Sequence, residues 1–538
     1  MTDDEEQHRL RGSSAASAGL QAGWTGTMTG WPRQPVIYEV NTAVWLADLT
    51  RAAGAPVTLD GVTDSDWDAV TPAGVDAVWL MGVWERSPAG LELARANAVL
   101  VESFREALPD LREQDIIGSP YCVRRYGADA RLGGPPGLAA ARTALAARGV
   151  RLILDYVPNH VAPDHPWVTR HPEFFIQGDE GDVTADPAGW LRVGPRVLAH
   201  GRDPYFPPWP DVVQLNAFAA AARAATARTL SDIAGQCDGI RCDMAMLMFN
   251  DIFASTWGSR AGQPPEEEFW PFVLGGLRAR HPDTVLIAEA YWDTEWRLQQ
   301  QGFGFCYDKR LYDRILEQNP PDVRGHLLAG LDYQTRMVRF LENHDEPRIA
   351  GQLPADLERA AAVTIATLPG ATLWHEGQFE GRRVRVPVFL ARRPDEPPDE
   401  ELAAWYRTLV RQVGEHRVRT GAWQLLQAAG WPDNQSARNL IAWCWTPGVD
   451  GGDVRRHVAV VNLSAAQAQA QIPLPWPDLP GRCWSLLDLI GGDDFRRDGG
   501  QLTDPGLYVD MRPGQCYLLA VRPARQPGPA AAAAAGAG

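Results

Sequence analysis

Short apolar runs recur along most of the chain, and stretches with a helical pattern separate them. Eight of these runs predict β-strands: VIYEV (36–40), VDAVWLMG (75–82), VRLILDYV (150–157), GIRCDMA (239–245), VLIAEAY (285–291), FCYD (305–308), MVRFLEN (337–343) and ATLWHEG (371–377). Continuous apolar runs are typical of parallel strands buried on both faces, and helical stretches such as 135–148 lie between them. Eight such units predict an α/β protein whose strands close into a (β/α)8 TIM barrel.

Two segments depart from this pattern. The stretch after the third strand is long, lacks periodicity and is rich in Pro, Trp, Asp and Gly, which predicts an inserted subdomain. Near the carboxy terminus, alternating runs separated by turn residues predict an antiparallel β domain. The expected division is a disordered tail over 1–30, a barrel over 31–157 and 217–425, an inserted subdomain over 158–216, a β-sandwich over 430–523 and a disordered tail over 524–538.

Composition narrows the possible partners. With 45% hydrophobic and 22% charged residues, the chain is typical of soluble globular proteins. Its formal net charge of -16 argues against nucleic acid or an anionic membrane as a partner, because both favour clustered Lys and Arg. The seven cysteines are dispersed and form no C-x-x-C pair, which argues against a disulfide framework or a zinc site. The polar amino terminus predicts a cytoplasmic protein.

Ionisable clusters follow four of the predicted strands, at the end of the barrel where TIM-barrel active sites form. They are Asp155 to His160 after the third strand, Arg241 to Asp243 after the fourth, Glu289 after the fifth and Asn343 to Asp345 after the seventh. A single carboxylate at a strand end is more often a cap or a salt-bridge partner than a catalytic group. Four clusters on one rim predict a shared site instead.

The residue types in these clusters suggest different chemical roles. Arg241 and Asp243 are two positions apart on a strand and therefore share a face, so the guanidinium is expected to keep Asp243 ionised and nucleophilic. Glu289 follows an apolar run and shares the site with two other carboxylates, which predicts a raised pKa and a general acid. Asp345 is placed to stabilise developing positive charge, with hydrogen-bond donors from His344.

Four segments resemble the signature regions of the α-amylase superfamily of retaining glycoside hydrolases and transglycosidases. They are DYVPNH (155–160), GIRCD (239–243), IAEA (287–290) and ENHD (342–345), and the likeness extends over roughly residues 34–395. The resemblance implies that Asp243 is the nucleophile, Glu289 the acid/base and Asp345 the transition-state stabiliser. It implies the following substrate-binding residues: Asp155, His160, Arg241, His344 and Tyr121, the last as an aromatic platform in GSPYCVRRYGAD (118–129).

The implied mechanism is double displacement, for which the two carboxyl groups lie roughly 5–5.5 Å apart. The chain departs from the family after Asp243, where Met244-Ala-Met-Leu247 replaces the Lys-His pair of many calcium-dependent endo-acting amylases. Starch endo-hydrolysis is therefore not expected. Asn159 matches a position that can help hold calcium, but an Asn that fixes the loop is the favoured interpretation. The chemistry requires no cofactor, and the metal prediction stays open.

Aromatic and basic residues near the strand ends are further candidates. Four tryptophans lie in or near these loops and could bind sugar faces: Trp84, Trp209, Trp257 and Trp292. Trp79, inside a strand run, is expected in the core. Arg382, Arg383 and Arg385 follow the eighth strand, where TIM barrels can bind phosphate, although a solvated basic stretch is favoured.

Three functions remain open from the sequence. The first is a glycosidase acting on α-glucosides or short α-glucans. The second is a transglycosidase or phosphorolytic relative, in which Met246 and Leu247 could form an apolar acceptor site that excludes water. The third is a non-catalytic carbohydrate-binding protein, which is disfavoured because all three carboxylates are present. The expected partner is an oligosaccharide or small α-glucoside, and its linkage and the oligomeric state are open.

Overall fold

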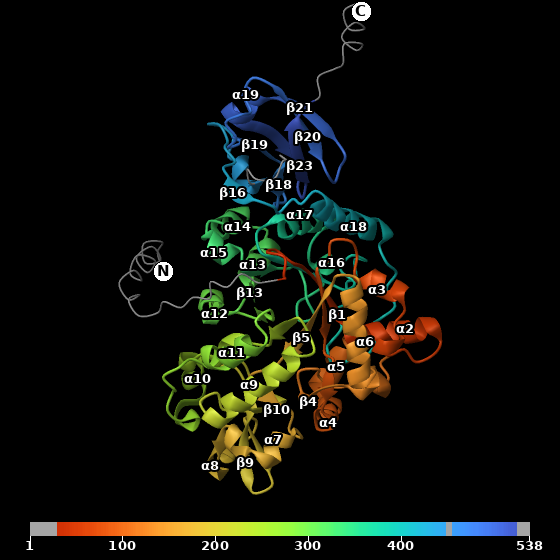
Figure 1. Cartoon of the computed structure of the whole chain (residues 1–538), viewed down its shortest axis with the longest axis vertical. Helices are drawn as coiled ribbons and strands as arrows, with labels where there is room; N and C mark the ends of the chain where they lie inside the picture. Colours follow the sequence, from red (N-terminus) through yellow and green to blue (C-terminus); the bar gives the residue numbers. More distant parts are fainter. Residues whose placement is uncertain (1–29, 448–454, 525–538) are drawn as a thin grey trace, which may run out of the picture.

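The computed structural model describes residues 30–447 and 455–524 (Figure 1). The tails predicted over 1–30 and 524–538 therefore lie almost entirely outside the described residues. Three regions follow one another along the long axis of the molecule, with an antiparallel insert at one end, a barrel in the middle and a β domain at the other end (Figure 1).

All eight predicted barrel strands form one closed parallel barrel, which confirms the TIM-barrel prediction. In chain order they are β1 (Val36–Asn41), β2 (Ala77–Met81), β5 (Arg151–Tyr156), β11 (Gly239–Cys242), β12 (Val285–Ala288), β13 (Phe305–Tyr307), β14 (Met337–Arg339) and β15 (Ala371–His375). The strands neighbour one another in this order, and β1 closes the ring by pairing with both β2 and β15.

Helices surround the barrel. They include α2 (Thr42–Ala53), α5 (Ala98–Ala107), α6 (Gly134–Ala147), α9 (Ala220–Ala234), α11 (Phe269–Arg280), α13 (Lys309–Leu316), α17 (Ala355–Thr367) and α18 (Glu400–Glu415). The predicted helix 135–148 is α6, where Pro135 and Pro136 occupy the first turn and alanines fill the body. No helix among the described residues is long and apolar enough to cross a membrane.

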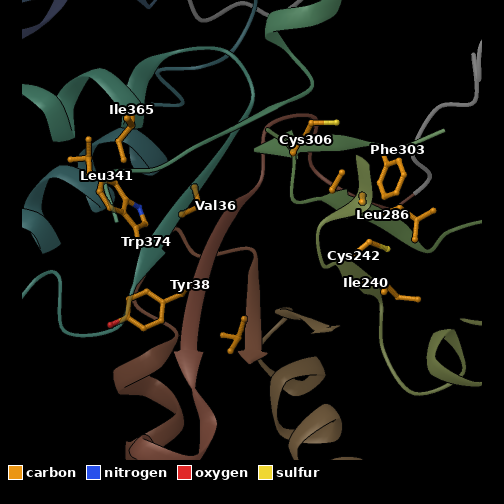
Figure 2. Packing of buried hydrophobic residues seen from close by; sticks show 14 of the residues in the cluster. Val36, Tyr38, Ile240, Cys242, Leu286, Phe303, Cys306, Leu341, Ile365 and Trp374 are labelled. Carbon is orange, nitrogen blue, oxygen red and sulfur yellow. The ribbon is translucent and has the colours of Figure 1, made fainter. Parts of the chain in front are cut away.

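Side chains alternate between two hydrophobic cores along each barrel strand. On β1 and β2, Ile37 and Trp79 pack inside the barrel, whereas Val36 and Val78 pack outward against the helices. Figure 2 shows this outer layer, in which Tyr38 and Trp374 belong to one side and Ile240 and Leu286 to the other; the remaining labelled residues of that layer are Val36, Cys242, Phe303, Cys306, Leu341 and Ile365. Because side chains alternate along a strand, each residue that neighbours an outward-facing one points toward the barrel axis.

The predicted insertion lies between the third and fourth barrel strands and is an antiparallel sheet. Its elements are β6 (His160–Val161), α7 (Pro166–Arg170), β7 (Gln177–Gly178), α8 (Glu180–Ala185), β8 (Trp190–Val193), β9 (Arg196–Gly201) and β10 (Trp209–Gln214). A small core of its own, built around Phe174, Phe175 and Leu198, stabilises the insert. β6 and β10 connect the insert to the carboxy end of β5.

The carboxy-terminal domain contains a six-stranded antiparallel sheet and a two-stranded sheet. The strands are β16 (Ala422–Leu426), β17 (Leu440–Thr446), β18 (Arg456–Asn462), β19 (Ala468–Ile472), β20 (Cys483–Asp488), β21 (Asp494–Asp498), β22 (Leu507–Met511) and β23 (Cys516–Pro523). The alternating runs in the sequence, NLIAWCW, RHVAVVNL, CWSLLDL, LYVDM and CYLLAV, correspond to β17, β18, β20, β22 and β23, and no predicted run corresponds to β16, β19 or β21. β19 reads AQAQI, with weakly apolar alanines, and β21 is a charged edge strand. β16 precedes residue 430, where the sequence predicts the domain to begin.

Candidate active site

The predicted strand-end residues meet around a cavity of about 330 Å³ at the carboxy end of the barrel strands. Twelve residues line it: Ser119, Tyr121, His160, Trp209, Asp211, Val212, Asp243, Met244, Glu289, Tyr291, Asp345 and Phe389. A larger cavity of about 770 Å³ lies near the starts of β1, β2 and β15. That end of a TIM barrel contributes to stability, so the smaller cavity is the candidate active site.

One buried guanidinium connects two of the three predicted catalytic carboxylates. Arg241, which is 1% exposed, places Nη1 2.8 Å from Oδ1 of Asp243 and Nη2 2.7 Å from Oε2 of Glu289. Trp79 and Tyr121 flank the guanidinium, each with its ring centroid 5.3 Å away. The pairing of Arg241 with Asp243 expected from their spacing is therefore present, and the same cation also holds Glu289.

Burial outweighs the guanidinium at Asp243. Desolvation raises the pKa of Asp243 above its ordinary value, and the attraction of Arg241 opposes this without reversing it. The neighbouring carboxylate of Asp345 raises the pKa further. Arg241 thus favours the ionised form of Asp243, as its spacing predicts, and burial acts in the opposite direction, which the spacing does not reveal.

Glu289 is held through both of its oxygens. Its Oε1 accepts a hydrogen bond from the Tyr291 hydroxyl at 2.8 Å, and its Oε2 accepts one from the Met244 backbone N–H at 2.7 Å. Met244 has a positive φ of 41°, which is rare for a residue with a side chain, and this turn directs its N–H toward Glu289. Burial raises the pKa of Glu289 to about 7 despite Arg241, as its apolar setting predicts.

Asp345, which lines the cavity, forms a charged pair with His344. Nε2 of His344 lies 3.0 Å from Oδ2 of Asp345 and 2.7 Å from the Tyr121 hydroxyl, and its Nδ1 contacts Glu39. Although burial opposes it, the two carboxylates raise the pKa of His344 well above its usual range, so the imidazole carries a proton. The Asp345 side chain is 47% exposed, and the partial loss of water around it raises its pKa; His344 and Arg241 reverse this and lower the pKa to about 2.

The remaining predicted substrate-binding residues divide into two groups. Tyr121 and His160 line the cavity; the Tyr121 ring stacks on His344 at 5.4 Å, and burial lowers the pKa of His160 to about 4, which keeps it neutral. Asp155, Arg241 and His344 lie behind the cavity wall instead. Asp155 is buried and accepts a hydrogen bond from the Gly82 N–H at 3.0 Å.

Several residues proposed for sugar contact are in the core. Met246 and Leu247 are 0% and 3% exposed and do not line the cavity, so the expected apolar acceptor site at these positions is wrong. Trp84 and Trp257 are also buried, as is Trp79, and Trp209 alone of the four candidate tryptophans lines the cavity. The turn that follows Asp243 folds inward as a 3-10 helix, which buries the apolar side chains.

Sequence reasoning missed three residues of the site. Glu39 contacts His344 and is the charged residue in the otherwise apolar run of β1, at a position that faces the barrel interior. A lone charge in such a run was the sequence feature that could have identified it. Tyr291 follows Glu289 by two positions, and nothing in the local pattern distinguishes it. Asp211 comes from the insert and lines the cavity because β10 packs beside the barrel rim.

The Asn159 side chain pairs with a second buried amide, that of Gln214. Its Oδ1 accepts a hydrogen bond at 2.8 Å from Nε2 of Gln214, and its Nδ2 donates to Oε1 of Gln214 at 3.1 Å. Both side chains are buried. Over the described ranges, no group of three or more His, Cys, Asp or Glu could hold a metal ion. The two amides satisfy each other, so the residues present at Asn159 do not fit a calcium ion.

A chelator is therefore expected to leave the thermal midpoint and any catalytic rate of the protein unchanged. Gln214→Ala is expected to destabilise the protein by about 1–3 kcal/mol, because it leaves the buried Asn159 amide unpaired. Thermal unfolding with and without EDTA checks both statements, with the exposed Gln467→Ala as the matched variant. A midpoint that falls with EDTA and returns with calcium would contradict the amide-pair interpretation.

No family model matches the chain, but individual proteins do. It is 24% identical over 377 residues to the α-amylase MalA of Haloarcula japonica, a match that covers 69% of this chain and 48% of that protein. It is 26% identical over 298 residues to an α-1,4-glucan:maltose-1-phosphate maltosyltransferase of Burkholderia pseudomallei, covering 53% of this chain and 22% of that protein. The chain spans about half the length of the first relative and less of the second.

Solved structures share the fold over nearly their whole length. The maltogenic α-amylase AmyB of Thermotoga neapolitana matches with a TM-score of 0.62 and 19% identity over 91% of this chain and 98% of that one. The α-amylase of Geobacillus thermoleovorans in complex with acarbose matches with a TM-score of 0.63 and 15% identity, over 92% and 99%. The sequence matches and the four signature segments in order around the barrel rim make the chain similar to members of the α-amylase family, and the solved structures show that it shares their fold.

Proposed function

We propose that the protein cleaves α-glucosidic bonds of neutral α-glucosides or short α-glucans with retention of anomeric configuration. The observation that carries the proposal is that the Arg241 guanidinium contacts both Asp243, the proposed nucleophile, and Glu289, the proposed proton donor. The relatives named above are α-glucan enzymes by their descriptions, which supports the substrate class.

In the first step of the proposed reaction, Glu289 donates its proton to the glycosidic oxygen. Its pKa of about 7 keeps a substantial protonated fraction near neutral pH. Asp243 attacks the anomeric carbon, and the bond to the leaving sugar breaks. Ionised Asp345 stabilises the positive charge that develops at the ring.

In the second step, Glu289 acts as a base. It takes a proton from water or a sugar hydroxyl, and the oxygen of that group attacks the anomeric carbon of the ester with Asp243. Two inversions give overall retention. Tyr291 and the Met244 N–H hold the Glu289 carboxyl in one orientation through both proton transfers.

The charge of the cavity wall favours a neutral substrate over a phosphorylated one. Four carboxyl groups line the cavity, from Asp211, Asp243, Glu289 and Asp345, and none of the described lining residues is Lys or Arg. Arg385 is exposed and donates to the backbone oxygen of Asp345 at 2.8 Å. A phosphate group in this cavity would meet net repulsion, which disfavours the phosphorolytic alternative.

Asp211 is a further candidate contact for sugar hydroxyls. Burial raises the pKa of Asp211, and among the described residues the hydrogen-bond donor to its carboxylate is its own backbone N–H. A carboxylate with free acceptor positions in a cavity is suited to hydroxyl donors.

Asp211→Asn is expected to raise KM for an α-glucoside about tenfold, because a hydrogen bond to a charged acceptor becomes a neutral one. The expected change in kcat is smaller, since Asp211 takes no part in the proton transfers. Steady-state kinetics measure both, and Asp504→Asn, far along the chain in the carboxy-terminal domain, serves as the matched control. An unchanged KM would remove Asp211 from the substrate site.

The proposed function is tested with a panel of α-glucosides: maltose, isomaltose, trehalose, sucrose, maltooligosaccharides and glycogen. Anomeric NMR is expected to show an α-configured product at early times, from at least one donor. A β-configured initial product would exclude double displacement. If the protein cleaves none of the donors but still binds them, the non-catalytic alternative is favoured.

A further inference from the structure

One arginine outside the active site has a buried guanidinium without a partner in the part of the chain that the structure describes. Arg86 ends β3 (Trp84–Arg86), which pairs with β4 (Val123–Ala128), and it is 5% exposed. Neither its Nη1 nor its Nη2 has a hydrogen-bond partner among the described residues. A charge that leaves water is costly unless another group pairs with it, so these two nitrogens are expected to have a partner.

The Arg86 guanidinium lines a cavity of about 180 Å³ beside α2. Most of the cavity wall is apolar and comes from α2 and from loops, and its charged residues are Arg86, Asp129 and Arg131. The Arg131 side chain is 53% exposed, so the cavity meets solvent beside it. Among the described residues, this cavity and the active-site cavity share no member, so a substrate in the active site does not occupy it.

The carboxylate in the cavity wall, that of Asp129, is already paired with Arg131. Its Oδ1 accepts a hydrogen bond from Nε of Arg131 at 3.0 Å, and its Oδ2 accepts one from Nη2 at 2.6 Å. The hydrogen bond between Asp129 and Arg86 uses the backbone instead, since the Arg86 N–H donates to Oδ2 at 3.4 Å. The two cations and one anion of the wall leave one net positive charge, and the unpaired guanidinium is that of Arg86.

Arg86 remains a cation in this setting. Burial and the repulsion of Arg131 lower the pKa of Arg86 to about 10, and the attraction of Asp129 opposes them. This pKa is still far above neutral pH, so the side chain does not lose its charge by releasing a proton. Because the described side chains leave both terminal nitrogens unpaired, their partner comes from outside the chain, as an anion or as water.

We propose that Arg86 binds a small, singly charged anion in this cavity, either a halide or a short carboxylate. Nη1 and Nη2 form the planar fork with which a guanidinium holds an anion through two hydrogen bonds. One net positive charge matches one negative charge. A phosphate dianion would bury an excess of charge, and the apolar remainder of the wall offers its oxygens few donors. The site does not depend on the proposed glycosidase function.

The proposed anion site lies behind a turn that supports the active site. Gly82 packs so closely that a methyl group there would lie 2.8 Å from Cβ of Pro120 and 3.1 Å from Nη2 of Arg86. The Gly82 N–H holds the buried Asp155, and Pro120 precedes Tyr121, which lines the active-site cavity. An anion that pairs with Arg86 is therefore expected to stabilise this turn and, with it, the folded protein.

The test follows thermal unfolding of the full chain while the anion changes at constant ionic strength. Sodium gluconate, whose anion is bulky, is replaced stepwise by sodium chloride, bromide, acetate or phosphate at pH 8. With a halide or acetate, the thermal midpoint of the unmodified protein is expected to rise by about 2–4 °C along a saturating curve, because only the folded state contains the site. Saturation by the halides identifies an inorganic ion as the ligand, and saturation by acetate identifies a carboxylate.

Three variants assign the effect to this cavity. Arg86→Met removes the charge and keeps an extended side chain, so it is expected to lose the saturating rise and to be at least as stable as the unmodified protein in gluconate. Ala47→Asp keeps Arg86 but adds a carboxylate to the wall of the same cavity, and it is also expected to lose the rise. The matched control is Arg105→Met, which removes a guanidinium from α5 whose side chain is 61% exposed, and it is expected to keep the rise.

A second measurement detects the ion without reference to stability. The unmodified protein is expected to broaden the ³⁵Cl NMR line of chloride, and the bound anion of the thermal test is expected to reverse the broadening by competition, whereas Arg86→Met is expected to broaden it much less. The proposal is wrong if no anion gives a saturating rise, or if the rise and the broadening persist unchanged in Arg86→Met. Saturation by phosphate alone would contradict the single charge of the ligand.

Discussion

Asp243→Asn is expected to reduce kcat by about 10⁴-fold or more on every α-glucoside that the protein cleaves, because the amide cannot form the covalent ester. The substitution preserves the volume of the side chain and leaves Arg241 paired with Glu289, so the fold is expected to persist. Initial rates at saturating donor, with thermal unfolding measured in parallel, check the prediction.

A variant with a smaller side chain at position 243 distinguishes the loss of the nucleophile from a general loss of folded protein. In Asp243→Ala, azide is expected to enter the vacated space and attack an activated aryl glucoside once, which gives an inverted glucosyl azide. Asp478→Ala, a surface carboxylate in the carboxy-terminal domain, is the control and is expected to keep its activity. Residual activity of Asp243→Asn within about tenfold of the unmodified protein would assign the nucleophile elsewhere.

Glu289→Gln is expected to lower kcat by about 10²–10⁴-fold on substrates with a sugar leaving group, because no acid protonates the departing oxygen. The loss is expected to be much smaller for a 4-nitrophenyl glucoside, whose leaving group needs little protonation. Burial raises the pKa of Glu289 to about 7, so the activity of the unmodified protein is expected to fall as the pH rises through about 7. Glu289→Gln is expected to lack this basic limb.

The acidic limb of the same profile belongs to Asp243. The nucleophile must be ionised, so activity falls as the pH decreases through its pKa, which burial raises above the ordinary value. Asp345, with a pKa of about 2, stays ionised throughout. Because Arg241 binds both carboxylates, the two apparent values belong to the pair. A basic limb near pH 7 that persists in Glu289→Gln would contradict the assignment of the acid.

The barrel could be predicted from the sequence because its strands are local features. Each run is continuous and apolar, since each strand is buried on both faces, and the period of two then assigns alternate residues to the interior. The pairing of Arg241 with Asp243 follows from the same period. The weak strands β19 and β21 could not be predicted, because alanine and charged residues carry little hydrophobic signal.

The sequence by itself determined the eight barrel strands, the insert, the carboxy-terminal sheet and the four polar clusters that gather at one rim. The tertiary structure alone decided which groups interact: Tyr291 donates a hydrogen bond to Glu289, and Glu39 pairs with His344. It also decided that Met246 is core and that burial raises the pKa of Asp243 more than the attraction of Arg241 lowers it. Desolvation and contact are sums over neighbours from distant segments, and local periodicity contains no information about them.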